Sequence, residues 1–104
     1  MASADLISMR ATDVVRLLRQ GDVTPLHLLD LIEARCAQVE PAVNALPTRD
    51  FAMARAAAKR VMEKSLDQRG RLAGLPVPIK DLTNVARMRS TMGSRIFENA
   101  VPAA

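Results

Sequence analysis

Apolar side chains recur at helical intervals through the first two thirds of this 104-residue chain, and that period constrains its fold more than any other feature. A first helix is predicted over about 11–20, with Ser8 or Thr12 as its start and Gly21 as its stop. The residues that fall at i, i+3 and i+4 in it are Val14, Leu17 and Leu18.

A second helix is predicted to begin at Thr24-Pro25. A threonine can cap the free amides of a first turn, and a proline in that turn has no amide that needs a partner. The helical spacing then continues to Pro41, so we expect a helix over about 25–39, followed by a strand or an extended connection over 42–47. Its apolar positions are Leu28, Leu29, Ile32, Cys36 and Val39.

A third helix is predicted over about 50–64, where alanines and other strong helix formers make an apolar stripe. After Gly74 the chain changes character. The run "LPVPI" is strand-like, but Pro76 and Pro78 lack amide donors, which suits a sheet edge, a strand start or backbone that lines a pocket. We therefore expect a strand and loop region over about 74–104.

Helices followed by one or two strands make an unfinished α/β unit, because two strands alone are marginal in water. The economical interpretation is that 1–104 belongs to a single domain whose sheet is incomplete in this chain. At this length a chain holds one small domain or a part of one.

Composition excludes several classes of function. The net charge is +4, but basic and acidic residues are interspersed, and the chain has neither Trp nor Tyr for stacking on bases, so we do not expect specific nucleic-acid binding. No apolar run is long enough for a membrane span, and the lone Cys36 indicates a reducing compartment. We expect a soluble, cytoplasmic protein. His27 and Cys36 have no neighbours at metal-ligand spacing, so no metal or cofactor is predicted.

Lys80, one of three lysines, ends the strand-like run "GLPVPIK". Two interpretations follow from the residues alone. Burial beside apolar residues would favour the neutral amine, which can act as a base. Alternatively, the stem lies along the surface and the ammonium reaches water.

The stretch "GRLAGLPVPIKDLTNVARMRSTMGS" resembles the signature of the amidase signature family, in which a Gly-Ile/Leu-Pro-x-x-x-Lys-Asp run precedes a Thr-Thr-x-Gly-Ser turn. The segment "ATDVVRLLRQGDVTPLHLLDLIEARCAQVEPAVNAL" is similar to that family's two opening helices and their connection. The resemblance covers nearly the whole chain.

The resemblance implies an α/β enzyme with a mixed sheet flanked by helices, which hydrolyses small-molecule amides through a Ser-Ser-Lys triad without a cofactor. Lys80 corresponds to the family's lysine base. The base would act through a bridging serine to activate a second serine, which attacks the carbonyl. Both serines of the family lie in a glycine- and serine-rich stretch beyond the positions matched here.

Four further residues carry expectations from the resemblance. Ser90 and Ser94 do not match the family's catalytic serines. Arg87 stands where relatives commonly have glycine. Asp81 matches the family's aspartate and is expected to hold local structure.

We therefore interpret 1–104 as an amino-terminal fragment of an amidase, with Lys80 as its catalytic residue, and expect the fragment alone to be inactive. Two alternatives stay open. One is the A-type subunit of a tRNA-dependent amidotransferase, and the other is a non-catalytic helical interaction module.

Overall fold

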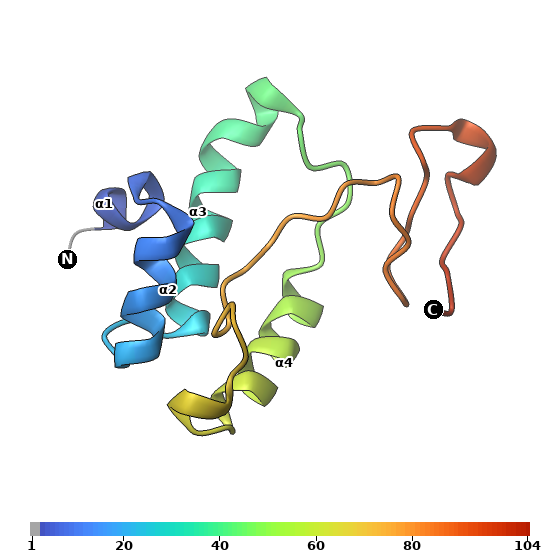
Figure 1. Ribbon diagram of the computed structural model, residues 1–104. Helices are drawn as coiled ribbons and strands as arrows, with labels where there is room; N and C mark the ends of the chain where they lie inside the picture. Colours follow the sequence, from blue (N-terminus) through green and yellow to red (C-terminus); the bar gives the residue numbers. More distant parts are fainter. Residues whose placement is uncertain (1–2) are drawn as a thin grey trace. The chain divides into compact units, whose positions relative to one another are not determined.

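The computed structural model describes residues 3–104, which fall into two compact units. Unit 1 contains the chain up to Ala45 together with Phe51–Pro76, and unit 2 contains Leu46–Asp50 together with Val77–Ala104. The elements, coloured along the chain in Figure 1, are α1 (Ser3–Ser8), α2 (Ala11–Gln20), α3 (Pro25–Val43), α4 (Phe51–Met62) and the short 3₁₀ helices η1 (Leu66–Gln68) and η2 (Arg95–Phe97).

Helix α2 occupies the range expected from its apolar spacing. It ends where Gly21 adopts a left-handed conformation with φ of 78°, and the Gly21 amide donates to the carbonyls of the last turn. Its start differs from the expectation, because the N-cap is Arg10, whose side chain makes no capping hydrogen bond. The six-residue helix α1 was not predicted, since it is too short to display a helical period.

Helix α3 begins as predicted and runs further than predicted. The Thr24 hydroxyl accepts a hydrogen bond of 3.1 Å from the His27 amide, which caps the first turn. The helix continues through Pro41 to Val43 rather than ending at residue 39, so 42–47 does not form one extended connection. A proline so near the end removes only one intrahelical hydrogen bond.

Two hydrogen bonds close the final turn of α3. Asn44 takes a left-handed conformation with φ of 50°, and its amide donates to the Glu40 carbonyl over 2.8 Å. The buried carboxylate of Glu40 accepts from the Ala45 amide over 3.1 Å. The helix terminus is therefore satisfied locally despite Pro41.

The core of unit 1 lies among its helices, where α3 packs against α4, α1 packs against α3, and η1 lies on α2. Figure 1 shows α1, α2 and α3 grouped together. Leu18 is completely buried, and Arg19 beside it donates to the Gly70 carbonyl over 2.7 Å, which holds the loop before Gly74 to α2. The buried cluster consists of Leu6, Val14, Leu18, Val23, Leu28 and Ala73.

Gly74 is required by its surroundings in unit 1. Its φ is 96°, in the left-handed region, and a Cβ atom there would lie 2.5 Å from Cγ of Pro25 and 3.3 Å from Val61. The backbone around Gly74 therefore packs directly on the first turn of α3. This close contact explains a glycine just before "LPVPIK".

Arg55 connects α4 to α3 on the surface of unit 1. Its guanidinium donates to Asp30 over 3.0 Å and to Glu33, and it lies 6.0 Å from the Phe51 ring centroid. The hydrogen bonds that Arg55 donates to Asp30 and Glu33 raise the pKa of Arg55 above its ordinary value. The two carboxylates of α3 thereby hold the Arg55 side chain of α4 in place.

The expected strands are absent from the described residues, which are helical or irregular. The run 75–80 is irregular, because Pro76 and Pro78 cannot donate to a ladder and no described segment pairs with it. In unit 2, the Arg87 amide bonds to Pro102 and the Ser90 amide to Ala100, but the left-handed φ of 63° at Arg87 interrupts any strand. The α/β character of the family is therefore not visible in this chain.

Candidate active site

Lys80 lies in unit 2, on an exposed turn rather than at the end of a strand. Its carbonyl accepts a hydrogen bond of 2.9 Å from the Thr83 amide, which closes a turn over 80–83. The side chain is exposed, so the desolvated environment considered from the sequence is not present around it here. The amine of Lys80 is therefore accessible to water. The position of the amine depends on the interactions that fix the turn.

Asp81 holds the lysine turn to a second turn ten residues further along the chain. Its carboxylate accepts from the Thr91 amide over 2.8 Å and from the Thr91 hydroxyl, while its carbonyl accepts from the Met92 amide over 3.1 Å. The hydrogen bonds from Thr91, hydroxyl first and amide second, lower the pKa of the Asp81 carboxyl below its ordinary value. Asp81 is thus ionised and bound by both its side chain and its main chain, which agrees with the local structural role expected of it.

The two serines near this turn are engaged in local hydrogen bonds. Ser90 is buried, and its hydroxyl accepts from the Val85 amide over 3.4 Å and donates to the Met88 carbonyl over 3.2 Å. Ser94 caps η2, where its hydroxyl accepts from the Ile96 amide over 3.2 Å. Both serines therefore stabilise local structure. This agrees with the family resemblance of the sequence, in which neither serine matches a catalytic serine of the family.

Arg89 joins the two chain segments that make up unit 2. Its guanidinium donates to the Thr48 hydroxyl over 3.2 Å and to the Glu98 carbonyl over 3.1 Å. A third bond, of 3.5 Å, reaches the Pro47 carbonyl. Residues 47–48 are therefore bound to the later segment of unit 2 through Arg89.

Sequence reasoning located Lys80 and Asp81 but missed Thr91 and Arg89. Thr91 is separated from Asp81 by ten positions, and Arg89 from Thr48 by 41, so no local spacing rule connects either pair. The signal available for Thr91 was the hydroxyl-rich turn "STMGS". Arg89 had no signal that distinguished it from the other arginines.

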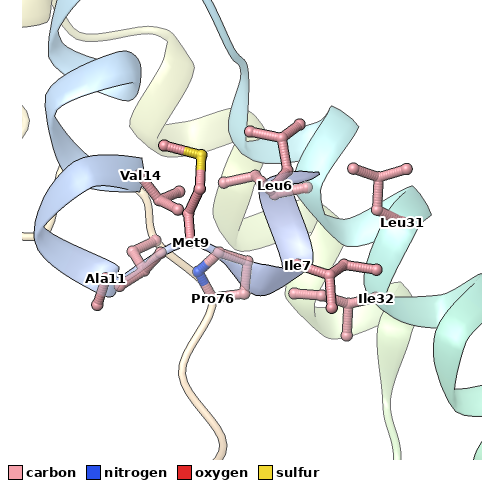
Figure 2. Close-up of a pocket in the computed structure, with 10 residues that line it drawn as sticks. Leu6, Ile7, Met9, Ala11, Val14, Leu31, Ile32 and Pro76 are labelled. Atoms are coloured by element: carbon pink, nitrogen blue, oxygen red, sulfur yellow. The ribbon is translucent and has the colours of Figure 1, made fainter. Parts of the chain in front are cut away.

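An apolar hollow of about 260 Å³ lies in unit 1, and Figure 2 shows the side chains that line it. All of the lining residues are apolar, so the hollow contains no acid, base or nucleophile. Elsewhere in unit 1, His27 is exposed and Cys36 is buried. Among residues 3–104, no cluster of three or more His, Cys, Asp or Glu side chains has the arrangement of a metal site.

A helix that crosses a bilayer has to be both long and apolar. Within the part of the chain that the structure describes, not one helix combines these two properties.

The sequence signature places a Lys-Asp run ahead of a hydroxyl- and glycine-bearing turn, and the structure adds that Asp81 bonds to Thr91 of that second turn. The family model described as "Amidase" matches residues 27–104, which include Lys80, Asp81 and Thr91. The chain belongs to the amidase signature family.

Curated relatives extend the match towards the amino terminus. The A subunit of glutamyl-tRNA(Gln) amidotransferase from Roseiflexus sp. (strain RS-1) is 35% identical over 98 residues, which cover 93% of this chain and 20% of that protein. The proteins of the same name from Shouchella clausii (strain KSM-K16) and Geotalea daltonii are 34% and 36% identical, over 88% and 82% of this chain and 19% and 18% of their own lengths. The chain thus spans about a fifth of these relatives. No solved structure matches it.

Proposed function

We propose that this chain supplies the lysine base of an amide hydrolase that works by serine acyl transfer. The observation that carries the proposal is the Lys80-Asp81 turn, anchored to Thr91 and contained in the segment that matches the family model. The substrate class is a small carboxamide. The serines of the reaction are to be supplied from outside residues 1–104.

In the proposed reaction, the neutral amine of Lys80 accepts a proton from a bridging serine, which takes one from the nucleophilic serine. The nucleophilic oxygen bonds to the amide carbonyl carbon, the C–N bond breaks, and the leaving amine or ammonia takes up the proton. Water then hydrolyses the acyl-enzyme. Closure of the site around Lys80 would remove the water that surrounds it in this chain and favour the neutral amine.

A hybrid enzyme tests this proposal. In the hybrid, residues 1–104 replace the matching segment of the Roseiflexus sp. relative, and ammonia release from glutamine and from a simple carboxamide is measured. Because a general base contributes on the order of 10²–10⁴ in rate, we expect Lys80→Ala to lower kcat by at least about 10². Lys64→Ala removes another exposed lysine and is the matched control.

Retention of full activity by the Lys80→Ala hybrid, while the unsubstituted hybrid is active, would refute the proposal. The 1–104 chain alone provides a second check. Because Ser90 and Ser94 are committed to local hydrogen bonds, we expect the purified chain to release no ammonia from either amide. Release that disappears on Lys80→Ala would show that this chain contains its own nucleophile.

A second candidate function is that of an A-type subunit in an amidotransferase that acts on charged tRNA. The names of the three relatives favour this candidate. It predicts that the hybrid, assembled with the other subunits of the relative's enzyme, supports amide formation on glutamyl-tRNA. A gel shift of 1–104 with tRNA over a salt series tests direct contact, because phosphate contacts weaken steeply as salt rises.

A non-catalytic helical module is distinguished from both enzymes by the behaviour of 1–104 in solution. A monomer that unfolds cooperatively would favour the module. A molten or aggregated chain would favour an enzyme fragment whose apolar faces need partners, since Leu82, Ile96 and Val101 are well exposed.

A further inference from the structure

We propose that Asp81 and Thr91 form a latch that positions Lys80 for its role as base. The inference rests on the proposed function and adds two positioning residues to it. Its basis is the geometry of the two turns, in which the residue next to Lys80 is held at its side chain and at its main chain by consecutive residues of the second turn.

The latch matters because little else restrains this region. Within the described part of unit 2, Ser90 alone is buried, so apolar packing does not fix the course of 80–83. The Thr83 amide closes the lysine turn internally but does not connect it to another segment. The three hydrogen bonds between Asp81 and residues 91–92 connect the residue next to Lys80 directly to a second segment of unit 2.

The hydrogen bonds of the latch are of a kind that holds two residues in one position. An ionised carboxylate that accepts an amide and a hydroxyl makes charge-assisted hydrogen bonds, which are shorter and stronger than neutral ones. The Thr91 hydroxyl in turn accepts from the Gly93 amide over 3.3 Å, so both ends of the second turn are engaged. Hydrogen bonds to the ionised form make this carboxylate a weaker proton acceptor, which favours Lys80 over Asp81 for the base role.

The latch is tested first in the hybrid enzyme, where residues 1–104 have their packing partners, by amide hydrogen exchange observed by mass spectrometry of peptides that contain Thr91. Asp81→Ala should accelerate exchange of the Thr91 amide by about tenfold or more, because it removes a hydrogen bond to a charged acceptor. Asp81→Asn keeps one acceptor and should have a smaller effect. Asp67→Ala, at an exposed aspartate of η1, is the matched control and should leave the Thr91 amide unchanged. An unprotected Thr91 amide in the unsubstituted, active hybrid would overturn the proposal.

The second test separates positioning from folding in the hybrid enzyme. Thr91→Val removes the hydroxyl and should lower kcat by about tenfold or more with KM little changed, because misplacing a catalytic group slows chemistry more than binding. Thr91→Ser keeps the hydroxyl and should restore most of kcat. Thr12→Val, at an exposed position of α2, controls for the substitution type.

The outcomes distinguish this inference from the proposed function. Loss of activity in Lys80→Ala, combined with full kcat in both Asp81→Ala and Thr91→Val, would overturn the latch and leave the function standing. Full activity in Lys80→Ala would refute the function itself, whatever the exchange data show for Thr91.

Discussion

Different interactions stabilise the interior of each of the two units of this chain. Unit 1 has a buried apolar cluster between helices, with Leu18 completely covered. Unit 2 exposes most of its large apolar side chains and is organised by hydrogen bonds that Asp81 accepts and that Arg89 and Ser90 donate. Apolar burial is non-directional and tolerates small shifts, but hydrogen bonds fix direction. Unit 1 therefore supplies stability, and unit 2 supplies a defined course for the turn that carries Lys80.

The largest effect on this contrast should come from the core of unit 1. Leu18→Ala leaves a cavity where the side chain was fully buried, and we expect it to lower the free energy of unfolding by about 2–5 kcal/mol. Denaturant titration followed by circular dichroism measures the change. Leu66→Ala, at a partly exposed leucine, should cost clearly less. Equal losses for the two variants would contradict a core centred on Leu18.

Gly74 gives the next largest effect. Gly74→Ala places a Cβ atom 2.5 Å from Pro25 at a φ that disfavours side chains, so we expect a loss of about 2–3 kcal/mol by the same titration. Gly70→Ala is the matched control, because Gly70 has φ of 77° but open space around its Cβ position. It should show only the backbone cost of about 1 kcal/mol. Similar losses would mean that contact with Pro25 is unimportant.

The order of unit 2 should depend on acid through Asp81. Because the pKa of this carboxyl is lower in the folded chain than in an unfolded one, its contribution is present above the unfolded pKa and is lost as pH falls through the folded pKa. We therefore expect the Thr91 amide to lose protection below about pH 4. Exchange measured over a pH series, corrected for the intrinsic rate, would reveal this, and Asp81→Asn should remove the dependence.

The smallest effect should come from Arg87, and it should be favourable. Arg87 holds a left-handed φ of 63° at a position where the resemblance indicates glycine. Arg87→Gly relieves that strain and loses some entropy, for a net gain of about 0.5–1 kcal/mol. Protection of the Ser90 amide reports on this part of unit 2. A decrease in protection would show that the arginine side chain stabilises its turn.

The contrast between the units also explains what the sequence could predict. The Gly21 stop of α2 and the Thr24 cap of α3 follow from local sequence signals, and the structure has both, whereas Arg10 rather than Ser8 or Thr12 precedes α2. The end of α3 could not be predicted from local spacing. The carboxylate of Glu40 and the left-handed Asn44 provide hydrogen bonds that let the helix continue past Pro41. The expected strands need neighbours that the described residues do not provide.

At the candidate site, the motif predicted which residue carries the chemistry but not its surroundings. Lys80 was placed by its family resemblance, and its role stays a prediction. The Asp81–Thr91 pair could not be predicted, since the two residues meet only when the intervening chain turns back. The sequence alternatives for Lys80 included desolvation, whereas the lysine is exposed in this chain.

The discontinuity of unit 2 has a consequence for the order of folding. Arg89 bonds to Thr48 across 41 positions, and all of α4 lies in the intervening loop. Closing such a loop costs entropy that later contacts must offset, and the cost is smaller once α4 has already folded onto α3. The helices should thus form early, and the lysine turn should reach its final course late, after residues 47–48 have been brought within reach of Arg89.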